Sequence, residues 1–169
     1  MRRIWVPPAL FAALTIQAAV WPSLFPGKVR PDLVLVLAIV VSLTRGTVAG
    51  VVTALVGGLF QDAMTGQFIG ANAGADMAVA ALVGFWEPRL FRENLFTPGV
   101  VIVAGTVLRE AIYLFIVGSF GAHVDLGRAV LVVMPWMASL NCVAGIWLYH
   151  RVYLRPRNRA RPYARVSEV

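Results

Sequence analysis

Charge is scarce in this sequence. Only 14% of its 169 residues are Asp, Glu, Lys or Arg, whereas 59% are hydrophobic. A soluble domain carries charge on about a quarter of its residues. The deficit argues against a water-soluble globule and indicates an integral membrane protein.

Cysteine and the signatures of soluble enzymes are scarce as well. The single cysteine, Cys142, lies in an apolar run, so it excludes an intramolecular disulfide and a thiolate metal cluster and is expected to pack as a small buried residue. GxSxG, HExxH, Walker and GxGxxG motifs are absent. His123 is expected in a loop and His150 at a membrane boundary, where neither can relay protons through the bilayer. We therefore predict neither a cofactor nor catalysis.

What charge there is gathers at one end of the chain. Of the net charge of +7, a large share comes from six arginines in the last nineteen residues: Arg151, Arg155, Arg157, Arg159, Arg161 and Arg165. A basic tail beside a membrane span is typical of a cytoplasmic segment that contacts anionic lipid, so nucleic-acid binding is not expected. We predict a transmembrane domain over residues 1–150 and a disordered basic tail over residues 151–169.

Apolar runs divide the chain into six predicted spans, because a spanning helix needs about 20 mostly apolar residues. They run from about Ile4 to Phe25, Pro31 to Thr44, Thr47 to Met64, Ala71 to Trp86, Pro98 to Phe120 and Leu126 to Tyr149. The second and fourth are short, so each can be tilted, half-buried or re-entrant. The first resembles a signal peptide, but Pro7 and Pro8 early in its apolar stretch favour a span that stays attached.

The distribution of basic residues predicts the orientation of these spans, because Lys and Arg are enriched in cytoplasmic segments. With the N-terminus inside, the cytoplasmic segments hold eleven of the fifteen basic residues and the outer loops hold three. The remaining one, Arg109, lies within the fifth span. Both termini are therefore predicted to be cytoplasmic.

Small residues recur along the third predicted span at spacings of three and four, which places them on one helix face. They are Gly46, Gly50, Ala54, Gly57 and Gly58. In lipid, such faces let helix backbones approach closely. The face is expected to pack within the chain or, alternatively, against a partner's helix.

Four charged side chains lie within spans: Asp62, Asp76, Arg109 and Glu110. Each needs a partner or a polar cavity, because a charge in lipid is costly. Depth along the helices predicts a polar cluster in the outer half of the bundle, with Asn72 one turn before Asp76 and with Arg109 neutralised by Asp76 or Asp62. The cluster either ties helices together or handles a ligand or protons.

An ordered set of residues in the first half of the chain resembles the MreD family of rod-shape-determining proteins. Arg30, Pro31 and Asp32 open an apolar span that Arg45-Gly46 closes; a glycine-rich span follows, and Asp62, Gly66, Gly70 and Asn72 come after it. The resemblance covers roughly residues 30 to 86. Asp76, Arg109 and Glu110 match no motif of the family.

The resemblance implies a bacterial inner-membrane protein that is not an enzyme and that holds MreC. Through MreC it would associate with RodA, its class B penicillin-binding partner and the MreB cytoskeleton. The family is also similar in fold to the S components of energy-coupling-factor transporters. The alternative function is therefore a small-molecule-binding transporter subunit, with an outer pocket lined by Asp62, Asn72, Asp76 and Phe68.

Overall fold

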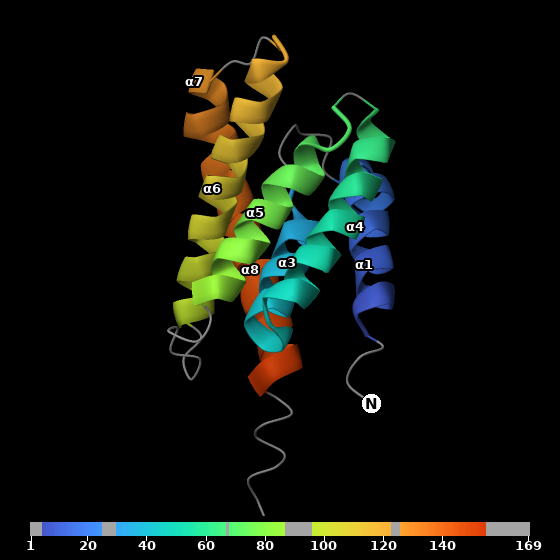
Figure 1. Ribbon diagram of the computed structural model, residues 1–169, viewed down its shortest axis with the longest axis vertical. Coiled ribbons are helices and arrows are strands. Elements are labelled where there is room, and N and C mark those ends of the chain that lie inside the picture. Colours follow the sequence, from blue (N-terminus) through green and yellow to red (C-terminus); the bar gives the residue numbers. More distant parts are fainter. Residues whose placement is uncertain (1–4, 25–29, 67, 87–95, 123–125, 155–169) are drawn as a thin grey trace, which may run out of the picture.

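The computed structural model describes residues 5–24, 30–66, 68–86, 96–122 and 126–154, and within these ranges the regular structure is entirely helical. Six helical segments run up and down side by side (Figure 1). The first segment consists of α1 (Val6–Thr15), the π-helical η1 (Ile16–Val20) and α2 (Trp21–Leu24). The next four are α3 (Leu33–Arg45), α4 (Thr47–Thr65), α5 (Ala71–Trp86) and α6 (Phe96–Ser119). The last joins α7 (Leu126–Arg128), η3 (Ala129–Val133), α8 (Met134–Tyr149) and η4 (His150–Leu154).

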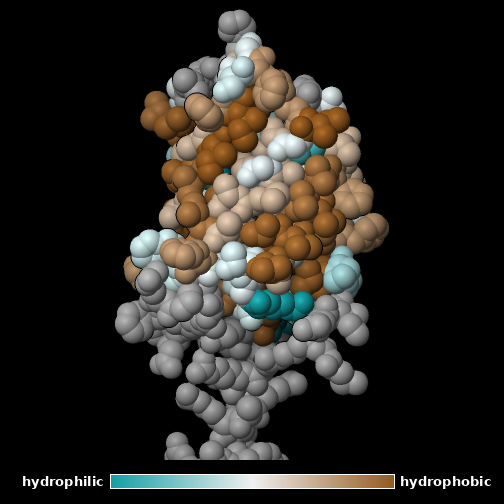
Figure 2. Space-filling view, in the orientation of Figure 1, coloured by the Kyte–Doolittle hydropathy of each residue, from teal (hydrophilic) through white to brown (hydrophobic). Residues whose placement is uncertain are grey.

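The predicted all-α membrane bundle is confirmed. In the described part of the chain, four helices are long and apolar enough to cross a membrane: Val6–Ser23, Thr47–Thr65, Phe96–Ser119 and Ala129–Val152. Apolar side chains cover most of the face in Figure 2, as contact with lipid requires. The helices α3 and α5, at 13 and 16 residues, are shorter, so full crossing by these two stays a prediction.

The helix α3 is the core of the bundle. Every residue from Val34 to Leu43 is buried, so this helix has no lipid-facing side. It packs against α1, α4, α5, α6 and α8. At 1.5 Å per residue it spans about 20 Å, less than the roughly 30 Å of a hydrocarbon core. Its two ends therefore lie at depths where polar groups need partners within the protein.

The N-terminal helix is part of this bundle. Leu10 and Leu14 form a cluster with Val34, Leu37 and Val41 of α3. These contacts give the first predicted span a packing role beside the core helix.

The chain reverses between α3 and α4 without a loop. Gly46 has φ +91°, a conformation that costs glycine little because it has no Cβ. Below, the end of the bundle with this turn is called the lower end, and the end with the α4–α5 turn is called the upper end (Figure 1).

The last helix extends beyond the predicted domain boundary. Helical structure continues through Leu154, four residues into the segment predicted as a disordered tail. Residues 155–169, like Ile4, Phe25 and His123, lie outside the described residues, so the predictions made for them stay predictions.

Candidate functional site

The side chain of Arg109 on α6 is the centre of a buried charge network. Its Nε donates to Asp76 Oδ1 at 3.1 Å, and its Nη2 lies 3.2 Å from Asp32 Oδ2. The guanidinium also donates to Glu110 Oε1 and to Asn72 Oδ1. Only 7% of the Arg109 side chain is exposed. One guanidinium thus joins the start of α3, the first two turns of α5 and its own helix.

The shape of the arginine side chain explains why it occupies this position. A guanidinium presents five N–H donors in a planar fork, so it can bind several acceptors from different directions. Its carbon Cζ also lies 4.9 Å from the ring centroid of Tyr113, one helical turn further along α6. A lysine would bring only a point charge to the same place.

The charges in this network do not balance within the described residues. Three carboxylates, those of Asp32, Asp76 and Glu110, form ion pairs with the one guanidinium. If all are ionised, the group carries two negative charges in excess. In addition, Asp76 Oδ2 is buried and has no hydrogen-bond partner among the described residues. Buried charge without a full set of partners is costly in lipid, so the network has capacity for a further cation or donor.

Polar contacts of Asp32 extend the network to two more helices. Its Oδ1 accepts from the backbone N–H of Leu35 at 3.1 Å, which caps α3, and from Gln61 of α4 at 3.0 Å. Its backbone N–H donates to Asn141 Oδ1 of α8 at 2.8 Å. Asn141 in turn donates to Thr106 of α6. Every helix that surrounds the upper half of α3, except the first, is therefore tied to this one aspartate.

Asp62 forms a separate, complete cap for α5. Its Oδ2 accepts from the backbone N–H groups of Gly70 and Ala73 at 2.8 and 3.2 Å. Its Oδ1 accepts from the backbone and side-chain N–H groups of Asn72 at 3.0 and 2.8 Å. The carboxylate also lies at the positive end of the helix dipole. Both oxygens of this fully buried acid are occupied by hydrogen bonds.

The structure brings together Asn72, Asp76, Arg109 and Glu110, and of the two acids proposed as partners of Arg109 it places Asp76 against the guanidinium. The ion pairs of Arg109 do not include Asp62. Asn72 bridges the two groups, since it donates to Asp62 and accepts from Arg109. The reason for the difference is that the backbone N–H groups at the start of α5 are closer to Asp62 than the guanidinium is, and they use both of its oxygens.

Most of the small-residue face of α4 is turned into the bundle. Gly50, Ala54, Gly57 and Gly58 are buried. A Cβ added at Gly58 would lie 2.4 Å from the Cα of Ala73 on α5. The face thus packs against α3 and α5 of the same chain. It is therefore occupied and does not offer the surface for a partner's helix that the alternative requires. Gly46 does not share this role, because it forms the turn at the lower end.

The remaining motif residues serve helix ends. Arg30 is exposed, and the carbonyl oxygen of Pro31 accepts from Gln17 at 3.0 Å. Gly66 ends α4 with φ +69°, and Gly70 precedes α5 with φ +96°.

Sequence reasoning missed four members of the network, namely Asp32 as an ion-pair partner, Gln61, Thr106 and Asn141. In the sequence, Asp32 belongs to the motif that opens an apolar span. An aspartate at the start of a helix indicates a cap and gives no sign of an ion pair. Asn141 was detectable, because a side-chain amide within a spanning segment needs a partner in lipid. Cys142 was expected to be buried and is half-buried, since it lines a groove between helices.

These features define a class: a helical membrane bundle whose short central helix is held at its upper end by buried ion pairs and caps. Within the described residues, no group of three or more His, Cys, Asp or Glu side chains is placed to hold a metal ion. The arrangement is suited to fixing helices relative to one another.

The family model for the rod shape-determining protein MreD matches residues 2–157, which is most of the chain. The chain belongs to the MreD family. No curated protein and no solved structure matches it significantly. The expected similarity in fold to the S components of energy-coupling-factor transporters therefore stays a prediction.

Proposed function

We propose that this protein is a non-enzymatic membrane scaffold of the bacterial rod machinery, which binds MreC and so supports peptidoglycan synthesis. Membership of a rod shape-determining family supports a role in cell shape. RodA, its class B penicillin-binding partner and MreB are proposed as indirect partners, reached through MreC.

The observation that carries the proposal is the way in which the buried polar groups are used. Asp62 caps α5, Asp32 caps α3, and Arg109 joins α3, α5 and α6. Asp62 and Arg109 link one helix to another, and Asp32 does so through Gln61 of α4 and Asn141 of α8. A rigid bundle with this internal bracing presents constant lipid-facing surfaces, which is what a scaffold offers to a partner's helix.

The proposed location is the bacterial inner membrane, with both termini in the cytoplasm and the lower end facing inward. Two arginine–tryptophan contacts at the lower end support this orientation. Arg45 lies 4.8 Å from the ring centroid of Trp5, and Arg151 lies 5.3 Å from that of Trp147. Tryptophan is enriched at membrane interfaces, and basic residues are enriched on the cytoplasmic side.

No specific contact favours the alternative function, a subunit that binds a small molecule. The oxygens of Asp62 and the side chain of Asn72 are engaged in caps and bridges. The ring of Phe68 lies 6.0 Å from that of Phe120, centroid to centroid. A ligand that used Asp62, Asn72 or Phe68 would have to displace these contacts; of the four predicted pocket residues, Asp76 alone keeps a polar atom, Oδ2, without a hydrogen-bond partner among the described residues.

The test is crosslinked affinity purification of the full chain from its native membrane. Recovery of MreC together with cell-wall synthases supports the scaffold. Recovery of ATPase subunits with a tightly held metabolite would replace it with the transporter function. A variant with Gly58→Leu, which is expected to separate α4 from α5, serves as the control for recovery that depends on the folded bundle.

A further inference from the structure

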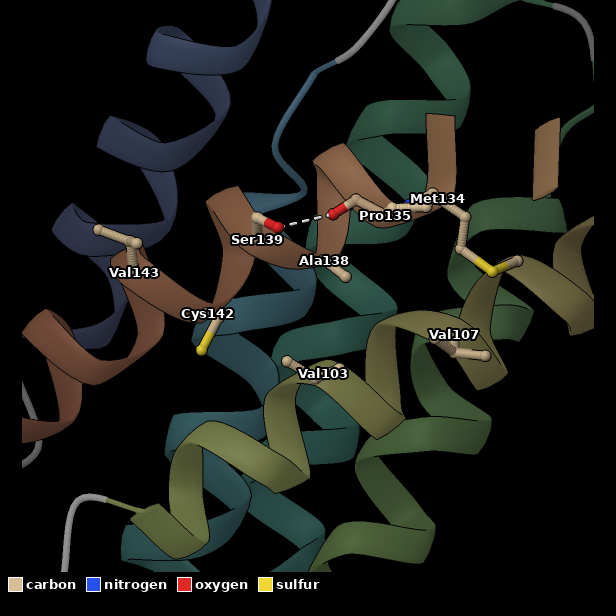
Figure 3. A pocket seen from close by; sticks show the side chains of 8 residues that line it. All are labelled: Val103, Val107, Met134, Pro135, Ala138, Ser139, Cys142 and Val143. Carbon is tan, nitrogen blue, oxygen red and sulfur yellow. Dashed lines mark hydrogen bonds between the residues drawn. The ribbon is translucent and has the colours of Figure 1, made fainter. Parts of the chain in front are cut away.

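An open apolar groove lies between α6 and α8, on the side away from the packed glycine face. It has a volume of about 460 Å³. The wall from α6 includes Val103 and Val107, and the wall from α8 includes Ala138, Ser139 and Cys142. Figure 3 shows Ala138 directed toward α6, and the sulfur of Cys142 lies 4.0 Å from the carbonyl oxygen of Gly99. The groove is large enough for several side chains of a neighbouring helix.

The α8 wall of this groove includes Met134 and Val143 and, between them, a series of smaller residues. Pro135, Ala138, Ser139 and Cys142 follow one another at spacings of three, one and three, so they share a helix face. The hydroxyl of Ser139 donates to the carbonyl oxygen of Pro135 in its own helix, which leaves the wall without a free donor (Figure 3). Small residues in lipid allow a second backbone to approach closely. Of these residues Ala138 is buried and Cys142 is half-buried, whereas Pro135 and Ser139 are exposed.

A carboxylate lies on α6 about one turn beyond the valines that line this groove. Glu110 follows Val103 by seven residues and Val107 by three, so at 3.6 residues per turn it lies within about 20° of Val103 around α6. With 14% of its side chain exposed, Glu110 is the most accessible of the three acids paired with Arg109. The exposed fractions of the Asp32 and Asp76 side chains are 5% and 0%. Of the acids in the network, Glu110 is therefore the one most accessible to a neighbouring helix.

We infer that this groove seats a transmembrane helix of a partner protein, and that the helix carries a lysine or arginine that pairs with Glu110. The inference rests on the proposed scaffold function and names the surface and the chemistry of the contact. Charge complementarity selects the occupant: three carboxylates share one guanidinium, Glu110 is the most exposed of the three, and an acyl chain has no cation to offer it. A basic side chain would be stabilised there by Glu110.

The experiment places a photocrosslinking amino acid at Val143 or Val107 of the full chain in native membranes. Matched controls carry it at Val48 on α4 and Phe85 on α5, which are also exposed, at 79% and 64%. The groove positions are expected to give an adduct with a transmembrane segment of MreC that contains a basic residue, and the control positions are not. Adducts at the control positions in place of the groove, or adducts with lipid alone at the groove, would overturn the inference and leave the scaffold function standing.

A charge exchange tests the second half of the inference. Glu110→Lys is expected to lower the adduct yield about tenfold, because like charges that face one another across an interface repel strongly. Changing the partner's basic residue to glutamate should restore the yield. Glu110→Gln, which removes the charge and keeps the shape, should give a smaller loss and guards against a folding defect. A yield that neither variant changes overturns the pairing, whereas the absence of adducts at all four positions together with a failed MreC purification overturns the scaffold function itself.

Discussion

The α4–α5 pair and the α6–α8 pair both carry small residues, but they direct them differently. On α4, the small residues face inward, and the backbones of α4 and α5 come so close that a Cβ at Gly58 would overlap Ala73. On α8, the series from Pro135 to Cys142 lines a groove that stays open toward the membrane. The same composition therefore closes one side of the bundle and leaves the other side able to accept a helix.

Arg109 on α6 pairs with Asp76 on α5 and so links the two helix pairs. Its removal should lower the stability of the bundle more than any other change. Arg109→Met would leave three carboxylates buried without a cation, and breaking such a pair costs about 3–5 kcal/mol. We expect the variant to lose its folded population on heating in mild detergent, as measured by size-exclusion chromatography. Arg109→Lys should fall between the variant and the wild type, because an ammonium cannot bind all the acceptors at once. Equal stability of Arg109→Met and the wild type would mean that the network does not hold α5 and α6 together.

The closed pair can be forced apart at its closest approach. Gly58→Leu inserts a side chain where even a Cβ lies 2.4 Å from the Cα of Ala73, and overpacking of this kind costs about 1–3 kcal/mol. The measurement is the same heating series. Gly118→Ala on α6 is the matched control, because a Cβ there meets no atom within 4 Å. Similar behaviour of the two variants would argue against close packing as the basis of the α4–α5 contact.

A milder way to loosen the closed pair is to remove the cap of α5. Asp62→Ala deletes the acceptor of four hydrogen bonds, and loss of a helix cap costs about 0.5–2 kcal/mol. Hydrogen exchange of the amides of Gly70, Asn72 and Ala73 should accelerate in this variant. The amides in the middle of α5 should change less. Thr65→Ala, an exposed position nearby, serves as the control.

A larger side chain in the groove between α6 and α8 should leave the stability of the bundle unchanged. Ser139→Leu fills part of the groove from an exposed position and breaks only a hydrogen bond within α8. A substitution of this kind changes the free energy of unfolding by no more than about 0.5 kcal/mol. Thermal stability in detergent should therefore match the wild type, while the amount of MreC recovered should fall. A loss of stability as large as that of Gly58→Leu would mean that α8 packs tightly along this face.

Much of the fold follows from the apolar pattern of the chain. The prediction of a helix over Ala71 to Trp86 agrees with α5 at both ends, because apolar residues stop where the chain must turn. The bundle interior was less accessible to prediction. Periodicity showed that the small residues of α4 share a face, but which neighbour covers that face is decided by tertiary packing.

The charge network was predictable in part. Depth along the helices was enough to bring Asp76 and Arg109 to one level. The role of Asp32 depends on how far the short α3 lies below the membrane surface, and a linear sequence does not record that depth. Likewise, the cap formed by Asp62 depends on the path of the chain through Gly66 and Gly70, where backbone conformation rather than hydropathy sets the geometry.

The order of the charged residues along the chain has a consequence for biosynthesis. The acids at the upper end of α3, α4 and α5 all precede Arg109, and Asp76 precedes it by 33 residues. A ribosome therefore delivers the carboxylates to the membrane before the guanidinium that pairs with them exists. The network around the short α3 is complete only after α6 has brought Arg109 and α8 has brought Asn141. The polar contacts of the first half of the chain thus depend on residues that the second half supplies.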